Sequence, residues 1–324
     1  MFTRLALAAC LATALAFGAR ADDDDKIMGV YEGAFSGKAF EGKTIRAEVI
    51  GRSKIQWQIN LFTGADGKEE KSQMEGRLKD GTAEVTGHTP LGELTGVIKA
   101  EEFTGKIKGD GKAGDFALKR VIVTPPTLGK EPPADAISLM NGKNMAENWV
   151  RTVEQWCLQD DGSMEVCESN LRTRQEFGDA EWHIEFRTPY KPNARDQERG
   201  NSGCYFMGRY EVQVLDSFGE EPRDNWCGGI YKKAKPLLGA SLPPLTWQTY
   251  DVTMIAPKFD ASGKKISDAE ITVYLNGKLI HDHVKLDSPT PGGVSDQDAA
   301  TGPLLLQNHD NPVRYRNIWV RPLK

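Results

Sequence analysis

Several features are scarce in this chain of 324 residues, and each scarcity excludes a class of protein. After residue 21, no segment approaches the roughly 18 apolar residues that a membrane-spanning helix needs. Lys and Arg number 41 against 46 Asp and Glu, so the net charge of −5 does not suit a nucleic-acid-binding protein. No long amphipathic helix is recognisable, whereas short alternating runs are common. We therefore expect an all-β globular protein without a transmembrane helix.

The first 21 residues are interpreted as a cleaved signal peptide. A basic start at Arg4 precedes the apolar run Leu5–Ala19, which closes on the small-x-small sequence Ala19-Arg20-Ala21. The alternative is a lipoprotein anchored through Cys10, because a lipobox precedes this residue. The apolar stretch before Cys10 is short and an equally apolar one follows it, so cleavage is favoured. A periplasmic or secreted location is predicted.

Four cysteines follow this leader: Cys157, Cys167, Cys204 and Cys227. An oxidising location would allow disulfides, and four cysteines permit three pairings. We favour Cys157–Cys167, which flank the hairpin signal Asp160-Asp161-Gly162-Ser163, with Cys204–Cys227 as the second bond. Buried free thiols are the alternative. A zinc site is disfavoured, because no CxxC spacing occurs.

Two β domains are predicted, separated by a proline-rich linker. Residues 27–120 contain short strands with glycines at intervals of about ten residues, which is typical of an antiparallel meander. Within them, Gln56–Leu61 alternates polar and apolar side chains, so a small accessory barrel or sandwich is expected. Adjacent prolines in 121–136 favour a semi-rigid extended spacer. Residues 137–324 again show short strands and polar turns, which predict a sandwich or jelly roll.

Two strands of the second domain carry polar faces. In Glu181–Thr188, the side chains of His183, Glu185 and Arg187 lie opposite an apolar face. In Arg209–Leu215, those of Arg209, Glu211 and Gln213 do the same. If both strands belong to one sheet, this face forms a groove for a polyhydroxylated ligand. The alternative is an ordinary solvated face with cross-strand ion pairs.

Glu211-Val-Gln213-Val-Leu-Asp216 has the spacing of the E-x-D-x-x-E pattern of jelly-roll β-glucanases. A retaining glycosidase needs two carboxyl groups about 5–5.5 Å apart. The amide of Gln213 therefore argues against ordinary retaining hydrolysis. Near the C-terminus, His309 follows a buried leucine run, and Arg316 lies on the polar face of the next predicted strand. Both are site candidates.

Residues 137–324 resemble the 3-keto-disaccharide hydrolase domain family, whose fold is a concanavalin-like jelly roll. The matching segments span nearly all of this region in family order: Leu139–Asn144 with Trp149, Glu176–Asp179 leading into His183–Arg187, Gly200–Gly203, Gly208–Ser217, Cys227–Tyr231 and Gly302–Leu323. The resemblance implies an exported enzyme that cleaves glycosides already oxidised to a ketone at sugar carbon 3. A base removes the proton on carbon 2, the group on carbon 1 leaves by β-elimination, and water then adds.

Such chemistry needs a base with a near-neutral pKa, an acid, and an electrophile that is either a divalent cation or Arg/Lys. No organic cofactor is expected, and the partner is an oxidised sugar. The predicted roles are distributed over ten residues: His309 or His183 as base, with Glu211 also catalytic; Glu185 and Asp216 as metal or hydroxyl ligands; Arg209 and Arg316 for the oxyanion or hydroxyls; and Asn201, Gln213 and Tyr231 to orient the sugar.

Two other functions stay open. One is a non-catalytic carbohydrate-binding module, because fold does not fix function. The other is a conventional β-glycosidase. The candidate face has more ionisable than aromatic side chains, which favours an enzyme over a lectin.

Overall fold

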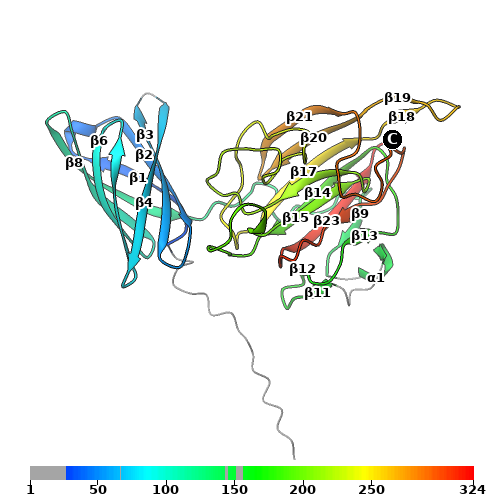
Figure 1. Cartoon of the computed structure of the whole chain (residues 1–324), viewed down its shortest axis with the longest axis horizontal. Coiled ribbons are helices and arrows are strands. Elements are labelled where there is room, and N and C mark those ends of the chain that lie inside the picture. The colour runs from blue at the N-terminus through cyan, green and yellow to red at the C-terminus, as the bar shows by residue number, and fades with distance from the viewer. Residues whose placement is uncertain (1–26, 66, 143–144, 151–155) are drawn as a thin grey trace, which may run out of the picture.

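The computed structural model describes residues 27–65, 67–142, 145–150 and 156–324. The predicted signal peptide and Cys10 lie outside these residues. The described chain is almost entirely β-structure and forms a barrel and a sandwich joined by an extended segment (Figure 1). The all-β prediction is confirmed. No helix in the described ranges is long and apolar enough to cross a membrane.

The barrel is closed and antiparallel, and β8 returns to pair with β1. Its elements are β1 (Gly29–Ser36), η2 (Lys38–Phe40), β2 (Lys43–Gly51), β3 (Gln56–Ala65), β4 (Lys68–Lys79), β5 (Thr82–Thr89), β6 (Gly92–Lys99), β7 (Glu102–Gly109) and β8 (Lys112–Val121). The alternation predicted in β3 is present, with Trp57, Ile59 and Leu61 in the barrel core. Asn60 is also buried, because it faces the sandwich rather than solvent.

The sandwich has one five-stranded and one eight-stranded antiparallel sheet, as in a jelly roll. The five-stranded sheet runs in the order β10 (Trp149–Val150), β13 (Leu171–Thr173), β22 (Leu305–Leu306), β15 (Ser202–Phe206) and β16 (Tyr210–Val214). The eight-stranded sheet runs in the order β11 (Trp156–Leu158), β12 (Met164–Val166), β23 (Arg314–Pro322), β14 (Ala180–Arg187), β17 (Gln248–Ile255), β20 (Ala269–Leu275) and β21 (Lys278–Leu286), with β9 (Ile137–Met140) beside β23. The remaining elements are α1 (Met145–Asn148), η4 (Asp196–Glu198), β18 (Lys258–Phe259) and β19 (Lys265–Ser267). Apolar side chains of both sheets fill the space between them.

This topology corrects one expectation about the polar faces. The two strands predicted to share a face, β14 and β16, belong to different sheets. Their apolar side chains meet in one core, so their polar side chains point to opposite sides of the sandwich. A period of two identifies the two faces of a strand but not the sheet that the strand joins.

The proline-rich segment 125–133, called the strap below, lies along the outer face of the eight-stranded sheet. Thr127 Oγ1 donates to Asp251 Oδ2 at 2.6 Å, and the Gly129 amide donates to Glu185 Oε1 at 2.5 Å. The carbonyl of Lys130 accepts from Trp319 Nε1 at 3.2 Å. The predicted spacer is therefore also a cover for this sheet.

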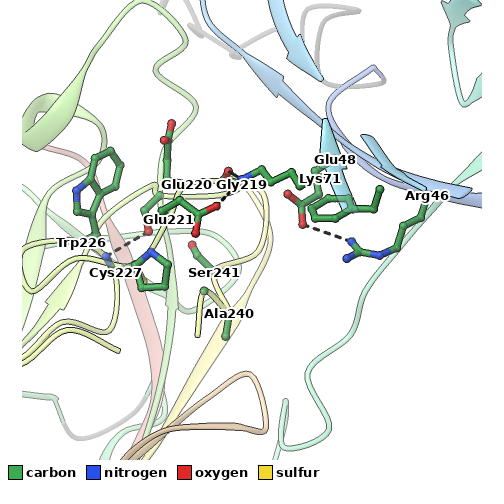
Figure 2. Close-up of a pocket in the computed structure, with 14 residues that line it drawn as sticks. Arg46, Glu48, Lys71, Gly219, Glu220, Glu221, Trp226, Cys227, Ala240 and Ser241 are labelled. Atoms are coloured by element: carbon green, nitrogen blue, oxygen red, sulfur yellow. Dashed lines mark hydrogen bonds and ion pairs between the residues drawn. The ribbon is translucent and has the colours of Figure 1, made fainter. Parts of the chain in front are cut away.

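Polar contacts join the barrel to the loop 215–232, which follows β16. Asn60 Nδ2 donates to the Gly219 carbonyl at 2.6 Å, and Lys71 Nζ pairs with Glu221 Oε1 at 2.8 Å. Figure 2 shows the hollow of about 220 Å³ between these parts. The basic side chains that line it already have acidic partners, including Arg46 with Glu48. We therefore interpret this hollow as a domain contact.

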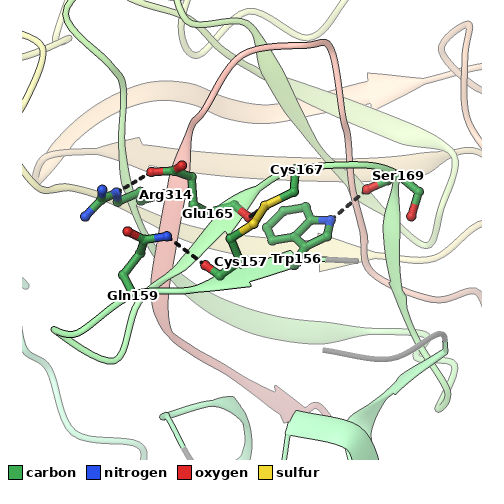
Figure 3. The surroundings of a disulfide bond; sticks show 7 residues. All are labelled: Trp156, Cys157, Gln159, Glu165, Cys167, Ser169 and Arg314. Atoms are coloured by element: carbon green, nitrogen blue, oxygen red, sulfur yellow. Dashed lines mark hydrogen bonds and ion pairs between the residues drawn. A yellow bond between two sulfur atoms is a disulfide. The ribbon is translucent and has the colours of Figure 1, made fainter. Parts of the chain in front are cut away.

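The Cys157–Cys167 disulfide is confirmed (Figure 3). It closes the predicted hairpin between β11 and β12, where Asp161 Oδ1 accepts from the Ser163 amide at 3.1 Å. The predicted Cys204–Cys227 bond is wrong, because both cysteines are free and buried. Each thiol contacts a different tyrosine hydroxyl in the core, and burial raises the pKa of both. That second pairing was inferred by elimination, which says nothing about distance.

Candidate active site

A cavity of about 190 Å³ lies on the outward face of the five-stranded sheet, over β15 and β16. The free edge of β16 is extended by residues 228–231: the Gln213 amide donates to the Gly229 carbonyl at 2.9 Å, and the Tyr231 amide donates to the Glu211 carbonyl at 3.2 Å. This pairing brings Tyr231 beside Glu211. The lining residues are Gln197, Asn201, Tyr205, Glu211, Gln213, Tyr231, Lys232, Pro291, Gly292, Gln307 and His309.

Glu211 is the acidic residue of this lining, and its side chain is only 2% exposed. It leans across to β15 over Gly203, where an added Cβ would lie 2.1 Å from Glu211 Oε1. Only glycine leaves room for the carboxyl group there. Burial raises the pKa of Glu211 to about 7, although the Tyr205 hydroxyl opposes this rise. A carboxyl group with this pKa can exchange a proton at neutral pH.

Three side-chain amides of the lining have a buried oxygen atom without a hydrogen-bond partner in the described part of the chain. Gln197 Oε1 accepts from Asn201 Nδ2 at 3.3 Å and from Gln213 Nε2 at 3.0 Å. Gln307 Nε2 donates to the Tyr205 hydroxyl at 3.2 Å. The oxygens of Asn201, Gln213 and Gln307 are buried and have no hydrogen-bond partner among the described residues. Buried acceptors without partners are costly, so these three suit a ligand that carries hydroxyl donors.

The rim of the cavity carries the cationic and titratable side chains. Lys232 and His309 are exposed, and Tyr231 is half-buried. Lys232 Nζ lies 5.4 Å from the centre of the Tyr231 ring, within the range of a cation–π contact. The rim can therefore supply a positive charge and a proton donor above the buried carboxyl group.

A second polar cluster lies on the opposite side of the sandwich, beneath the strap. His183 Nδ1 lies 2.9 Å from Asp251 Oδ1, and its Nε2 lies 3.5 Å from Glu185 Oε1. Arg316 Nε donates to Glu185 Oε2 at 2.7 Å, and Asn317 Nδ2 donates to Glu185 Oε1 at 2.9 Å. The His183 ring is fully buried and stacks on Trp319. We call these residues the strap cluster: Asp251, His183, Glu185, Arg316, Asn317 and Trp319.

The electrostatics of the strap cluster are those of a satisfied ion network. For Glu185, burial alone would raise the pKa, but hydrogen bonds from His183, Asn317, Gly129 and Arg316 lower it to about 2. For His183, burial alone would lower the pKa, but the contacts with Asp251 and Glu185 raise it. Both shifts favour the charged forms. Three predicted site residues thus meet each other here, away from the cavity.

Two further predicted residues belong to neither cluster. Arg209 lies at the turn between β15 and β16, where its guanidinium donates to the carbonyl oxygens of Gln297 at 2.6 Å and Met207 at 2.9 Å. Asp216 is buried, and its Oδ2 lies 2.6 Å from Arg199 Nη2. These contacts brace loops. The cavity therefore gathers Glu211, Gln213, Asn201, Tyr231 and His309 from the predicted set.

Comparison with known proteins places this sandwich in a family. Residues 135–321 match the family described as the 3-keto-alpha-glucoside-1,2-lyase-like domain. The chain belongs to this family. The resemblance identified from the sequence motifs is confirmed.

Similar solved structures are described as glycosyl hydrolases. One from Parabacteroides distasonis, described as a "putative glycosyl hydrolase", is 34% identical with a TM-score of 0.53, and the match covers 59% of this chain and 85% of that chain. Another from the same organism, with the same description, is 21% identical with a TM-score of 0.43, and the match covers 58% and 99%. Comparison with curated protein sequences found no match.

Four polar residues of the cavity were not predicted from the sequence: Gln197, Tyr205, Lys232 and Gln307. Two had a usable signal, since Tyr205 shares a strand face with Gly203, and Gln307 ends the leucine run before His309. Lys232 follows the predicted Tyr231 directly. Gln197 lies in the short helix η4, and no sequence pattern marks it.

The predicted metal ligands do not fit a shared cation. Glu185 lies in the strap cluster, and Asp216 is paired with Arg199 on the other side of the core. Within the described ranges, no group of three or more His, Cys, Asp or Glu side chains could hold a metal ion. Both carboxylates already face guanidinium groups. Glu185 and Asp216 therefore belong to separate ion pairs rather than to one cation site.

Proposed function

We propose that this protein cleaves 3-keto-glycosides in the cavity over β15 and β16. The observation that carries the proposal is the buried Glu211, whose pKa is raised to about 7, beside three unpartnered amide oxygens. The oxygens suit the hydroxyl groups of a sugar. The carboxyl group suits removal of a carbon-bound proton that a neighbouring ketone has acidified. Membership of the lyase-like family supports the same substrate class.

The proposed reaction begins with transfer of the proton on carbon 2 to the Glu211 carboxylate. The electron pair of that C–H bond forms an enediolate with the ketone, and Lys232 at the rim balances the negative charge on oxygen 3. The enediolate then collapses, forming the C1=C2 double bond and breaking the bond from carbon 1 to the leaving oxygen. His309 donates a proton to that oxygen. Water adding across the double bond returns the 3-keto sugar.

Three residues were candidates for the base: His183 and His309, which were predicted for this role, and Glu211. His183 is fully buried under the strap on the opposite sheet, so it could reach a cavity ligand only through major rearrangement. His309 is exposed on the rim, where a leaving group would depart. Glu211 is therefore the proposed base, and His309 the proposed acid.

The two alternatives fit the cavity less well. A conventional β-glycosidase needs a pair of carboxyl groups. The lining has one, because Gln213 occupies the second position and Asp216 is paired with Arg199. A lectin would not need a buried carboxyl group with a near-neutral pKa.

The deciding experiment measures turnover of methyl 3-keto-glucoside and of unoxidised methyl glucoside, each in both anomeric forms, with and without a chelator. Turnover of the keto sugar alone would support abstraction of the carbon 2 proton, and exchange of that proton with deuterated solvent would support it directly. Turnover of the unoxidised sugar would favour a conventional glycosidase. Binding of both sugars without turnover would favour a lectin. Loss of activity with the chelator would contradict a mechanism that uses side chains alone.

We also propose that the protein is exported to the periplasm or secreted. The signal-peptide pattern in residues 1–21 supports this, and so does the Cys157–Cys167 disulfide, since such bonds persist in oxidising compartments. Mass spectrometry of protein recovered from the periplasm or medium should find Asp22 as the first residue. A lipid-modified Cys10 would indicate anchoring instead.

A further inference from the structure

A row of residues crosses four of the five strands of this sheet in register. Arg172 of β13 lies opposite Leu305 of β22, Leu305 lies opposite Tyr205 of β15, and Tyr205 lies opposite Glu211 of β16. Cross-strand partners point to the same face of a sheet. Three strand spacings separate Arg172 from Glu211, or about 14 Å. The face that carries the cavity therefore continues well beyond one sugar ring.

A second hollow, of about 520 Å³, lies over the far half of this row. We call it the groove; it is lined by Val150, Asn170, Arg172, Val294 and Leu305, with Ser169 and Gly293. It adjoins the cavity along the chain: Gly292 lines the cavity, and the next residue, Gly293, lines the groove. Tyr205 lies in the row between the two hollows, and its hydroxyl donates to the Pro291 carbonyl at 3.1 Å.

The groove differs from the cavity in chemistry. Its floor is apolar, with Leu305 buried and Val294 39% exposed. The oxygen of Asn170 is engaged by the Asn308 amide at 2.8 Å. None of the buried side-chain atoms without a partner lies in this lining, whereas three lie in the cavity. A second sugar would find few acceptors for its hydroxyl groups there.

The charge in the groove is positive. Arg172 is the charged residue of the lining, and no carboxylate accompanies it. Its side chain is exposed and has no ion-pair partner in the part of the chain that the structure describes. A guanidinium above an apolar floor suits a flat ring that carries an anionic group.

Resting on the proposed function, we propose that the groove holds the leaving group of the glycoside, and that this group is an aromatic ring bearing a carboxylate. With the keto sugar over Glu211, the bond from carbon 1 points along the row towards Leu305. The ring would lie on Val294 and Leu305, and its carboxylate would pair with Arg172.

The test compares unoxidised glucosides as competitive inhibitors of methyl 3-keto-glucoside turnover, because inhibition does not depend on how well a leaving group departs. Methyl, phenyl, 4-carboxyphenyl and glucosyl glucosides are used in both anomeric forms. We expect phenyl to bind about tenfold more tightly than methyl, since it buries an apolar ring. We expect 4-carboxyphenyl to gain roughly a further fivefold from an exposed charge pair. Arg172→Gln should remove only the carboxylate gain, and Val294→Ser should reduce only the phenyl gain.

Lys112→Gln, an exposed barrel substitution, serves as the matched charge control and should change neither gain. Equal inhibition by all four compounds, or tightest inhibition by the glucosyl compound, would overturn the proposal. If methyl 3-keto-glucoside is not turned over at all, the proposed function fails. Calorimetric binding of the same four glucosides to wild type and Arg172→Gln then judges the groove separately.

Discussion

The cavity and the strap cluster are two buried polar groups on the opposite outer faces of one sandwich, and each is centred on a glutamate. Glu211 is buried and has no ion-pair partner among the described residues, and its pKa is raised to about 7. Glu185 is equally buried but receives hydrogen bonds from an arginine, an asparagine and a backbone amide, and its pKa is lowered to about 2. The same residue type is thus poised to exchange a proton on one face and fixed as an anion on the other.

The difference shows why a cluster of ionisable residues does not by itself identify a site. In the strap cluster every charge has a partner, and the strap covers it, so its groups stabilise the fold. Among the described residues, three amide oxygens of the cavity lack partners, the Glu211 carboxyl group has only the Tyr205 hydroxyl, and the hollow is open to solvent. Missing partners, rather than the number of charges, separate a binding site from a structural network.

The largest expected effect is on turnover, and it should separate the two glutamates. Glu211→Gln removes the proposed base and should lower kcat on a 3-keto-glucoside by about 10³-fold. The wild-type rate should fall tenfold per pH unit below about 7, because the base must be charged. Steady-state kinetics against pH checks both. A Glu211→Gln protein with normal kcat would remove Glu211 from the mechanism.

The next effect is on stability and belongs to the strap cluster. Glu185→Gln leaves Arg316 and His183 without their carboxylate, so the free energy of unfolding should fall by about 3 kcal/mol. Turnover per folded molecule should stay within a factor of two. Because the folded-state pKa of Glu185 is below its ordinary value of 4.5, its contribution is present above pH 4.5 and is lost as the pH falls towards 2.

For His183 the pH dependence of the stability contribution is opposite to that of Glu185. Its folded-state pKa is raised, so its contribution is complete below pH 6.5 and is lost as the pH rises through the folded-state value. Denaturant unfolding from pH 3 to 9 checks both directions. A strong loss of kcat in folded Glu185→Gln protein would instead connect the strap cluster to the chemistry.

At the cavity, ionisation of the glutamate should lower the stability of the fold rather than raise it, and by a smaller amount. The raised pKa of Glu211 means that the folded protein resists losing this proton, so stability should fall between pH 4.5 and about 7. Glu211→Gln removes that cost and should raise the free energy of unfolding by roughly 2 kcal/mol at pH 8. Unfolding of the two proteins at pH 4 and pH 8 checks this. If the two proteins differ in free energy of unfolding by the same amount at pH 4 and at pH 8, ionisation of Glu211 is not the cause.

The smallest effect compares two amides. Gln213→Ala removes a buried, unpartnered acceptor of the cavity lining and should lower kcat/KM about tenfold, mostly through KM. Asn317→Ala removes a donor to Glu185 in the strap cluster and should leave kcat/KM unchanged while lowering stability. Kinetics and thermal unfolding of both variants check the pair. If Asn317→Ala lowers kcat/KM and Gln213→Ala does not, the cavity is not the sugar site.

The sequence allowed much of the fold to be predicted, because strand faces repeat every two residues. The alternation in Gln56–Leu61 and in β14, the hairpin at Asp160–Ser163 and the jelly-roll family all correspond to the structure. Only about half of the candidate site could be predicted from the sequence. His183 and Glu211 both lie opposite an apolar face, yet one joins the eight-stranded sheet and the other the five-stranded sheet.

What the sequence could not supply was long-range pairing. The partners of Glu185 come from positions 129, 183, 316 and 317, and no local pattern connects them. For the same reason Cys204 and Cys227 were assigned to each other by elimination, although they pack in the core as free thiols. Gln197 orients two amides of the cavity from a short helix that has no periodicity to detect.

The strap also bears on how such proteins can be recombined. A gene fusion that joined a new N-terminal module directly before β9 would leave Thr127, Gly129 and Lys130 behind. The carboxylates of Glu185 and Asp251 and the indole of Trp319 would then lose hydrogen-bond partners on a newly bared surface. The unit that can be exchanged between proteins therefore starts near residue 125, inside the apparent linker. In this chain the connecting segment is structurally part of the sandwich that it covers.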